Sequence, residues 1–377
     1  MNILIAMDSF KGSVTSLEAG AAVKQGIVNA GLTAETVILP VADGGEGTIE
    51  AFVDQTNGRT QTLTVTGPLG EKVEAAFGVI GDQAIIEVAE TSGITLVKKA
   101  DLNPWRATSF GLGELIKKLI SDGQRKFIVG LGGSATNDGG LGMLQALGYR
   151  FIGKDGSEIG RNICEIEHMS SVDDSQVLPA LKKCHFLIAS DVTNPLVGEN
   201  GATAIFGPQK GVKEAEIKQI DQLLQHFAEV TTDYVQKDVS EIPGAGAAGG
   251  LGFAFIAYLQ AEIQPGFPLL AKEKNLAEKI KAADLVITGE GRLDAQSVMG
   301  KVPSALAKLA QKEAKPIIAI AGSVSDDVGQ CNAHGIDAFF PIIRQIAPEE
   351  ETLKKETTVE SIRQTAEQLF RFYQKMK

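Results

Sequence analysis

Cysteine, histidine and tryptophan are scarce in this sequence: its 377 residues include three cysteines, four histidines and one tryptophan. Cys164, Cys184 and Cys331 are odd in number and far apart, so they indicate neither a disulfide framework nor a CxxC motif. Such cysteine usage is typical of a reducing compartment, and we expect a cytoplasmic location. None of the histidines belongs to a pair with metal-ligand spacing, which argues against a zinc site.

Basic residues are in the minority as well. Lys and Arg number 36 against 47 for Asp and Glu, which gives a formal net charge of -11. No part of the sequence has the basic stripe of a nucleic-acid-binding protein, so we exclude nucleic acid as a partner. The net acidity also means that a site for an anionic ligand has to be built locally, from backbone N–H groups, a few cations or a metal ion.

Long hydrophobic runs are missing, with one partial exception. Residues 242–261 are uncharged and long enough to span a membrane, and Gly246 and Gly250 form a GxxxG motif. Because Pro243 and several glycines crowd the first half, the stretch predicts a glycine-rich turn that leads into a core helix. The N-terminus has no basic region and predicts no signal peptide. We therefore expect no membrane partner, and a monomer or a homodimer.

The spacing of apolar residues predicts an α/β fold. The chain begins with a buried strand at Asn2–Met7 and a helix over Ser16–Asn29, and this alternation is typical of a parallel sheet with crossover helices. Residues 60–89 instead contain three runs of alternating polarity separated by turns, which predicts an antiparallel meander. The architecture therefore changes near residue 60.

The last quarter of the sequence alternates like the first, with a predicted strand at Leu285–Thr288 followed by further helices and strands. Similar end segments around a different middle indicate a discontinuous domain with an insertion. We predict a two-domain α/β protein. A three-layer α/β/α domain with a parallel sheet is formed by residues 1–60 and 284–377, and a second α/β domain is inserted over residues 61–283.

Glycine, by contrast, is abundant: 42 residues, or 11% of the chain, against about 7% in average proteins. Much of it follows predicted strands directly and is interleaved with charged and hydroxyl residues. Ligands of open α/β sheets bind at the carboxyl ends of the strands, so these segments are candidate binding loops. They span residues 8–13, 43–48, 130–140, 191–195 with 207–211, and 288–294.

The first two segments combine charged residues with the start of a predicted helix. Asp8–Ser13 holds a lysine and two hydroxyls where a helix N-terminus would favour an anion, although a capped turn with a solvated lysine explains the same residues. Asp43–Thr48 holds two carboxylates that would bind Mg²⁺ or accept a proton. The alternative for Asp43 is a helix cap.

The later segments add a glycine nest, an acid and an arginine. The N–H groups of Gly130–Gly140 are suited to an anion. Asp191 follows a predicted strand at His185–Ala189 and would face the same crevice, or simply open a turn. Thr288–Asp294 contains two acids and Arg292, whose guanidinium suits a phosphate or carboxylate. A local Arg–Asp pair is the alternative there.

Gly130–Ala135 also fits the GxGxxA pattern of dinucleotide-binding proteins. Residues 137–140 would break the helix that this motif has to open, which counts against the pattern. An NAD-dependent oxidoreductase acting on a small hydroxy acid nevertheless remains one alternative function. A non-catalytic protein that binds a nucleotide or a sugar acid is the other.

Together the segments resemble the type I glycerate kinase family. The matching stretches are DSFKGS (8–13), VADGGEGT (41–48), GLGGSATNDGG (130–140), SDVTNPLVGENGA (190–202), FGPQKG (206–211), PGAGAAGGLG (243–252) and TGEGRLDAQSVMGK (288–301). The resemblance covers nearly the whole chain. It implies an ATP-dependent kinase that phosphorylates D-glycerate with Mg²⁺, with the active site in the cleft between two α/β domains. It favours 2-phosphoglycerate over 3-phosphoglycerate as the product.

This resemblance, together with the chemistry of phosphoryl transfer, suggests individual roles. We expect Asp191 to act as the base for the substrate hydroxyl, with Lys11 and Arg292 as catalytic cations. The residues expected to bind ATP are Ser9, Gly132, Gly133, Ser134, Thr136 and Asn137. Those expected to bind the substrate are Asp8, Lys210 and Arg292. Those expected to hold Mg²⁺ or its waters are Asp43, Glu290 and Asp294.

Overall fold

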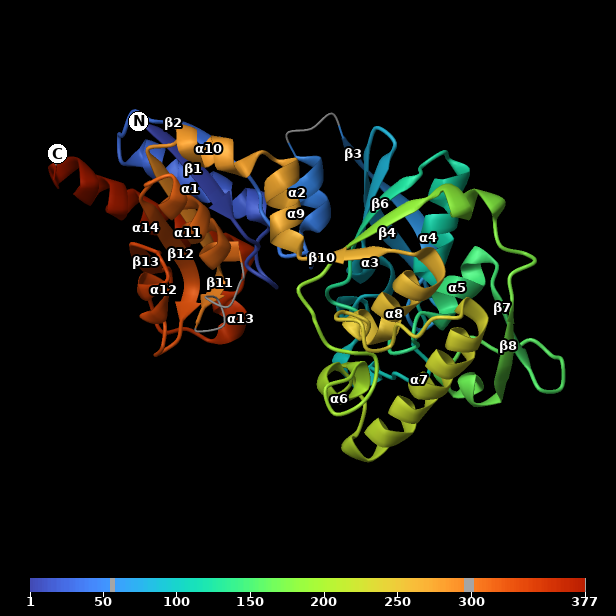
Figure 1. Cartoon of the computed structure of the whole chain (residues 1–377). Helices are drawn as coiled ribbons and strands as arrows, with labels where there is room; N and C mark the ends of the chain where they lie inside the picture. The colour runs from blue at the N-terminus through green and yellow to red at the C-terminus, as the bar shows by residue number, and fades with distance from the viewer. Residues whose placement is uncertain (55–57, 295–301, 377) are drawn as a thin grey trace. The chain divides into compact units, whose positions relative to one another are not determined.

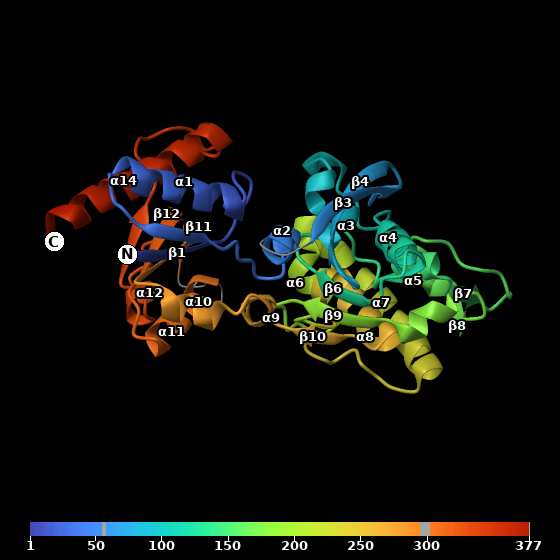
Figure 2. The ribbon, with the colours of Figure 1, turned by 90° about the horizontal axis from the view of Figure 1, so that it is seen from above.

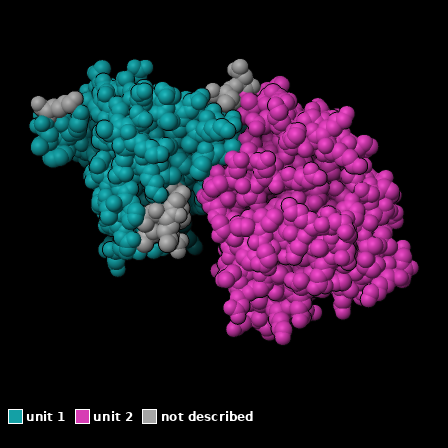
Figure 3. Space-filling model, in the orientation of Figure 1, with its two compact units in different colours: residues 1–43, 50–54, 267–377 teal, residues 44–49, 55–266 magenta. Residues whose placement is uncertain are grey.

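A computed structural model describes residues 1–54, 58–294 and 302–376 of the chain. The chain forms two compact units, which Figure 3 distinguishes by colour. Unit 1 contains residues 1–43, 50–54 and 267–377, and unit 2 contains residues 44–49 and 55–266. Each unit is therefore built from more than one stretch of the chain.

The unit boundaries differ from the residue numbers that the sequence suggested. Residues 267–283 belong to unit 1, because helix α10 (Leu276–Ala282) packs against the first strand and against a later helix of that unit. Leu276 and Ile280 are the residues that α10 buries. At the other boundary, residues 44–49 belong to unit 2.

Unit 1 is a three-layer α/β/α structure. Its described strands form one parallel sheet in the order β13-β12-β11-β1-β2. They are β1 (Asn2–Met7), β2 (Glu35–Ile38), β11 (Leu285–Leu293), β12 (Ile317–Val324) and β13 (Ala338–Pro341). Figure 2 shows α1 (Ser16–Asn29) and α14 (Lys355–Met376) on one face of this sheet, with α10 and α11 (Val302–Lys312) on the other. The predicted fold class is confirmed.

The first helix illustrates why these residues fold as they do. The hydroxyl of Thr15 accepts from the Glu18 N–H, and the Glu18 carboxylate accepts from the Thr15 N–H, so the two residues form a capping box at the start of α1. Alternate residues of β1, among them Ile3 and Ile5, pack in one core with the buried faces of α1 and α14. The shorter helices α9 (Gly266–Glu273), α12 (Gln330–Ala333) and α13 (Glu349–Thr352) complete the unit.

Unit 2 contains a larger mixed sheet in the order β10-β9-β6-β5-β4-β3. Its strands are β3 (Arg59–Thr66), β4 (Lys72–Ile80), β5 (Gln83–Glu87), β6 (Lys126–Gly130), β9 (His185–Ala189) and β10 (Glu262–Gln264). β3, β4 and β5 are antiparallel neighbours, which confirms the meander, whereas β5, β6, β9 and β10 run parallel. A separate hairpin of β7 (Arg150–Gly153) and β8 (Met169–Asp173) was not predicted.

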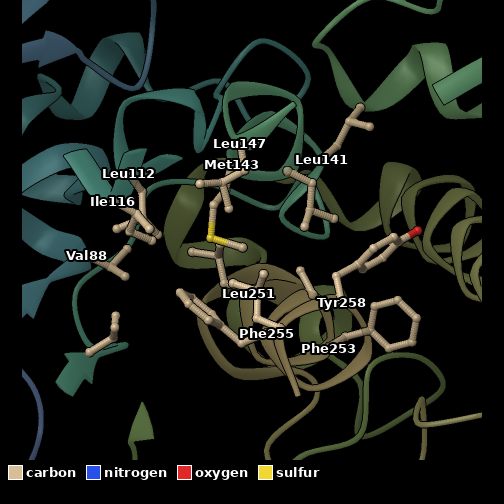
Figure 4. Packing of buried hydrophobic residues seen from close by; sticks show 14 of the residues in the cluster. Val88, Leu112, Ile116, Leu141, Met143, Leu147, Leu251, Phe253, Phe255 and Tyr258 are labelled. Atoms are coloured by element: carbon tan, nitrogen blue, oxygen red, sulfur yellow. The ribbon is translucent and has the colours of Figure 1, made fainter. Parts of the chain in front are cut away.

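The helices of unit 2 bury one continuous apolar core. They are α3 (Val88–Ser92), α4 (Phe110–Ser121), α5 (Leu141–Leu147), α6 (Ala202–Phe206), α7 (Glu214–Val235) and α8 (Ala247–Leu259), and α2 (Thr48–Val53) begins in this unit (Figure 1). Figure 4 shows Leu112 of α4, Met143 of α5 and Phe255 of α8 directed into the same core. The long helix α7 is amphipathic, and the residues that it buries include Ile220, Leu224 and Phe227.

The uncharged stretch at residues 242–261 becomes a turn followed by α8. Ala248, Gly249 and Gly250 have positive φ angles inside the span of α8, so the helix is kinked there. Among the described residues, no helix is both long enough and apolar enough to cross a membrane.

One predicted loop is part of a strand. The sequence suggested that a strand ends at Thr288, but β11 continues to Leu293 and pairs with β12 along this extension. Gly289 and Gly322 make the pairing possible, because a Cβ at either position would collide with the backbone of the neighbouring strand. Residues 295–301, the end of the last matching motif, lie outside the described residues.

Several glycines of unit 2 allow one loop to lie directly on another. A Cβ added to Gly130 would lie 2.5 Å from the carbonyl oxygen of Gly44, and one added to Gly132 would lie 2.5 Å from the Cα of Gly45. A Cβ at Gly249, whose φ is +70°, would collide with the carbonyl oxygen of Thr136. The backbones of residues 44–45, 130–140 and 243–252 are therefore packed too closely for side chains.

This packing predicts the effect of single alanines. Gly249→Ala and Gly156→Ala both place a Cβ at positive φ, which costs about 1–2 kcal/mol. Apart from Gly156 itself and its two chain neighbours, no atom of the described residues lies within 4 Å of a Cβ at Gly156, whose φ is +79°. Collision with Thr136 should add about 1–3 kcal/mol at Gly249 alone. We expect a clearly lower urea midpoint for Gly249→Ala than for Gly156→Ala, and equal midpoints would contradict the close packing.

Candidate functional site

The glycine-rich and acid-rich segments of unit 2 gather at one edge of its sheet. The last residues of three parallel strands are in register, with Glu87 opposite Gly130 and Gly130 opposite Ala189. Gly44 lies on this edge, because a Cβ there would be 2.7 Å from the Ala189 carbonyl oxygen. The structure therefore brings together the segments at 44–48, 130–140 and 190–195.

Glu87 anchors the second of the predicted segments, although the sequence offered no prediction for this residue. Its carboxylate accepts hydrogen bonds from Ile49 N at 2.7 Å and from Gly47 N at 3.3 Å. Burial, with smaller contributions from Glu90 and Glu46, raises the pKa of Glu87 to about 7. An acid that ends an otherwise apolar strand was the signal available in the sequence.

Asp138 anchors the third segment, residues 130–140, in the same way. It is fully buried, and its carboxylate accepts from Ser109 N and Oγ, both at 2.8 Å, and from the N–H groups of Gly140 and Gly142. Burial raises the pKa of Asp138, while these donors favour its charged form. The carboxylate thus fixes the end of the loop and the start of α5.

The predicted ATP-binding residues of this loop differ in accessibility. Gly133 is exposed and Gly132 is partly exposed, whereas Ser134, Thr136 and Asn137 are buried. The Asn137 amide donates to Thr203 Oγ1 at 2.9 Å. Within residues 1–54, 58–294 and 302–376, no hydrogen-bond partner is present for Thr136 Oγ1 or Asn137 Oδ1. The parts of this loop that a ligand can contact in the folded protein are therefore the backbones of Gly132 and Gly133.

Lys210 is predicted to bind substrate, but its side chain is buried beneath this loop. It follows α6 in a short 3₁₀ helix, and only 2% of its surface is exposed. Its Nζ donates to Ser134 Oγ at 2.8 Å and to the Thr136 carbonyl oxygen at 2.7 Å. Burial lowers the pKa of Lys210 to about 7, and the negative charge of Asp138 opposes this effect. Direct substrate contact by Lys210 stays a prediction.

Asp191, the predicted base, is exposed just beyond β9. Its Oδ1 accepts a hydrogen bond from Gly266 N at 3.2 Å. This bond ties the carboxylate to the backbone at the start of α9, and the role of Asp191 as the base stays a prediction.

In unit 1, the first predicted segment meets the acid of the last. Met7 at the end of β1 is in register with Gly289 of β11, so Asp8 and Glu290 are neighbours at the same sheet edge. Burial is the main reason that the pKa of Asp8 is raised to about 8, and the negative charge of Asp43 adds to it. Lys11, which is exposed, lies 3.7 Å from Asp43 Oδ2. Ser9 N donates to Asp8 Oδ1 at 2.7 Å.

Arg292 and Asp294 lie at the end of β11 and form an ion pair, with Arg292 Nε 3.9 Å from Asp294 Oδ2. The guanidinium remains largely exposed, so the local pair that the sequence allowed does not withdraw it from solvent. In the described part of the chain, no three His, Cys, Asp or Glu side chains converge as metal ligands. Asp43, Glu290 and Asp294 as Mg²⁺ ligands stay a prediction.

The GxGxxA pattern at Gly130–Ala135 does not open a helix. α5 begins only at Leu141, and the residues between belong to the loop that Asp138 and Lys210 hold. A dinucleotide-binding motif requires its glycines at the helix N-terminus. The fold and the polar loops at the carboxyl ends of its parallel strands therefore define a ligand-binding α/β protein of another kind.

Comparison with known proteins shows to which family the chain belongs. The sequence model of the glycerate kinase family matches residues 3–374. The chain is 48% identical to glycerate 2-kinase of Escherichia coli, over 94% of this chain and 93% of the relative. It is 46% identical to a glycerate kinase of Haemophilus influenzae, over 94% of each chain. A crystal structure described as glycerate kinase 2 from Salmonella typhimurium LT2 superposes with a TM-score of 0.86 at 42% identity, covering 100% of this chain and 99% of that one.

The chain belongs to the glycerate kinase family. The predicted resemblance is thereby confirmed over nearly the full length of the chain.

The buried carboxyl of Asp8 predicts a pH-dependent stability. Its folded pKa of about 8 lies above the ordinary value of 3.8, so the folded protein binds this proton more tightly than the unfolded chain does. The resulting stabilisation is complete below about pH 4 and is lost as the pH rises toward 8. Asp8→Asn keeps an acceptor for Ser9 N and cannot ionise, so it should raise the melting temperature more at pH 8.5 than at pH 5.

Asp326→Asn is the matched control, because it removes an exposed carboxyl from the same unit. It should shift the melting temperature equally at both pH values. The same pH-independent shift for Asp8→Asn would show that Asp8 is charged in the folded protein throughout this range.

Proposed function

We propose that this protein is a kinase that transfers the terminal phosphoryl group of ATP to D-glycerate. The observation that carries the proposal is the match to the glycerate kinase family over residues 3–374, which includes every candidate loop described above. Relatives named glycerate kinase or glycerate 2-kinase support it at 43–48% identity. The three cysteines are free thiols, which is consistent with action in the cytoplasm.

Phosphoryl transfer needs positioned phosphates and neutralised charge more than covalent help from the protein. In unit 2, the backbone of Gly133, which is exposed, and of Gly132, which is partly exposed, would receive phosphate oxygens, and Asp138 fixes the end of the loop to which they belong. In unit 1, Lys11 and Arg292 would supply positive charge from exposed side chains. Local groups of this kind would offset a net charge of -11.

The acids of unit 1 suit a divalent cation. The charges of Asp43 and Glu290 both raise the pKa of Asp8, which indicates crowded carboxylates whose repulsion a cation would relieve. Oxygen ligands of this type are those that Mg²⁺ prefers. We propose that Asp43, Glu290 and Asp294 hold Mg²⁺ directly or through its waters. When bound, the ion would neutralise charge on the phosphates of ATP.

The proposed base is Asp191, whose exposed carboxylate would accept the proton of the attacking hydroxyl. We propose further that the phosphate goes to the 2-hydroxyl, giving 2-phosphoglycerate. The name of the Escherichia coli relative, glycerate 2-kinase, supports this choice over 3-phosphoglycerate.

An ADP-release assay with D-glycerate and ATP tests the reaction, and NMR of the product locates the phosphate on carbon 2 or carbon 3. We expect ADP only when D-glycerate and Mg²⁺ are both present. Formation of NADH from NAD and D-glycerate without ADP release would favour an oxidoreductase. Ligand binding with neither product would favour a non-catalytic binding protein.

A substitution at the base makes the mechanism testable. Asp191→Asn keeps an acceptor for Gly266 N but cannot take the proton, so kcat should fall about 10²- to 10⁴-fold with little change in the KM for ATP. Asp233→Asn on α7 removes an exposed acid elsewhere in unit 2 and should leave both constants unchanged. A kcat near that of the wild type for Asp191→Asn would remove Asp191 as the base.

A further inference from the structure

The ammonium group of Lys210 is buried without an ion-pair partner in the described part of the chain. Its hydrogen bonds go to Ser134 Oγ and to the Thr136 carbonyl oxygen, which use two of its three N–H donors. A charged group in such surroundings is costly, and an apolar side chain of the same length would fill the same space more favourably. A reason other than packing is therefore needed for a lysine at this position.

The two acceptors of Lys210 lie on the loop that we propose for ATP phosphates. The same loop is also fixed to the end of α3 and to the residues that follow it: Ala135 N donates to the carbonyl oxygen of Ser92, the last residue of α3, and Ile94 N donates to the Gly133 carbonyl oxygen, both at 2.8 Å. These backbone bonds hold Gly133 and Ala135. Lys210 holds Ser134 and Thr136, so residues 133–136 are fixed by two separate segments of the chain.

The Thr136 peptide has little freedom to move away from Lys210. Gly249 lies against the Thr136 carbonyl oxygen so closely that a Cβ there would collide with it. Without the ammonium group, this carbonyl would lose its hydrogen bond while remaining buried, and the loop would have to shift to find another donor. Gly132, which is partly exposed, and Gly133, which is exposed, directly precede Ser134, so their backbone would shift with it.

We propose that Lys210 is a positioning residue for the nucleotide: it sets the conformation of the Gly132–Gly133 backbone through Ser134 and Thr136 and touches neither ATP nor D-glycerate. This inference rests on the proposed function, because it takes the loop to be the phosphate site. It differs from the role expected from the sequence, in which Lys210 contacts the substrate.

Lys210→Met tests the proposal, since methionine fills a similar volume and suits a buried position. We expect the Kd for ATP, measured by calorimetry without D-glycerate, and the KM for ATP to rise about tenfold or more. The KM for D-glycerate and the kcat at saturating ATP should change less than threefold. Lys213→Met, an exposed lysine at the start of α7, is the control and should resemble the wild type.

Ser134→Ala is a second, milder substitution, because it removes one hydrogen-bond acceptor of Lys210 without removing a buried charge. Alone, it should weaken ATP binding. Combined with Lys210→Met, it should add little, because both changes break the same contact. Fully additive effects would overturn the proposal, as would an unchanged Kd for ATP in Lys210→Met.

Two other outcomes assign a different role to Lys210. A rise confined to the KM for D-glycerate would make it a substrate contact, and a fall confined to kcat would make it a contact of the transferring phosphoryl group. Either overturns the positioning role while leaving the proposed function intact. Wild-type protein that binds no ATP and releases no ADP would overturn both.

Discussion

The feature on which the rest of unit 2 depends is the direct packing of backbone on backbone at the carboxyl edge of its sheet. Gly44 lies on Ala189, and Gly132 lies on Gly45, at distances that leave no room for a Cβ. Loops packed in this way cannot be fixed by interlocking side chains, which normally define a protein interior. Their conformation has to be fixed by hydrogen bonds to backbone groups instead, and these bonds have to be made where water is excluded.

Buried charges supply those bonds. Glu87 and Asp138 accept hydrogen bonds from N–H groups of the segments at 47–49 and 140–142. Lys210 donates hydrogen bonds to a hydroxyl and a carbonyl oxygen of the loop at residues 130–140. Each charge is costly to bury, and burial is the largest cause of the altered pKa of all three groups. A hydrogen bond to an ion is stronger than one between neutral groups, so a few such residues hold loops that have almost no side chains of their own.

Periodicity and turn chemistry were enough to predict the regular elements. β1 and α1 have the predicted bounds because an apolar run and a capping box define their ends locally. The same reasoning ended β11 too early, because Gly289 and Gly291 interrupt the apolar run although the strand pairs through them. It also missed Glu87 and did not predict the burial of Lys210, since the role of a charged residue depends on partners 38 and 76 positions away in the sequence.

The glycine excess needs a different explanation from the one that composition suggests. Loops rich in glycine at strand ends predict a backbone open to ligands, but much of this glycine serves contacts between loops. Gly44, Gly130 and Gly249 are buried against other backbone. Gly133 has a positive φ and is exposed, so neighbouring backbone does not account for it. The buried glycines shape the loop, and the exposed one is where we propose that the loop meets a phosphate.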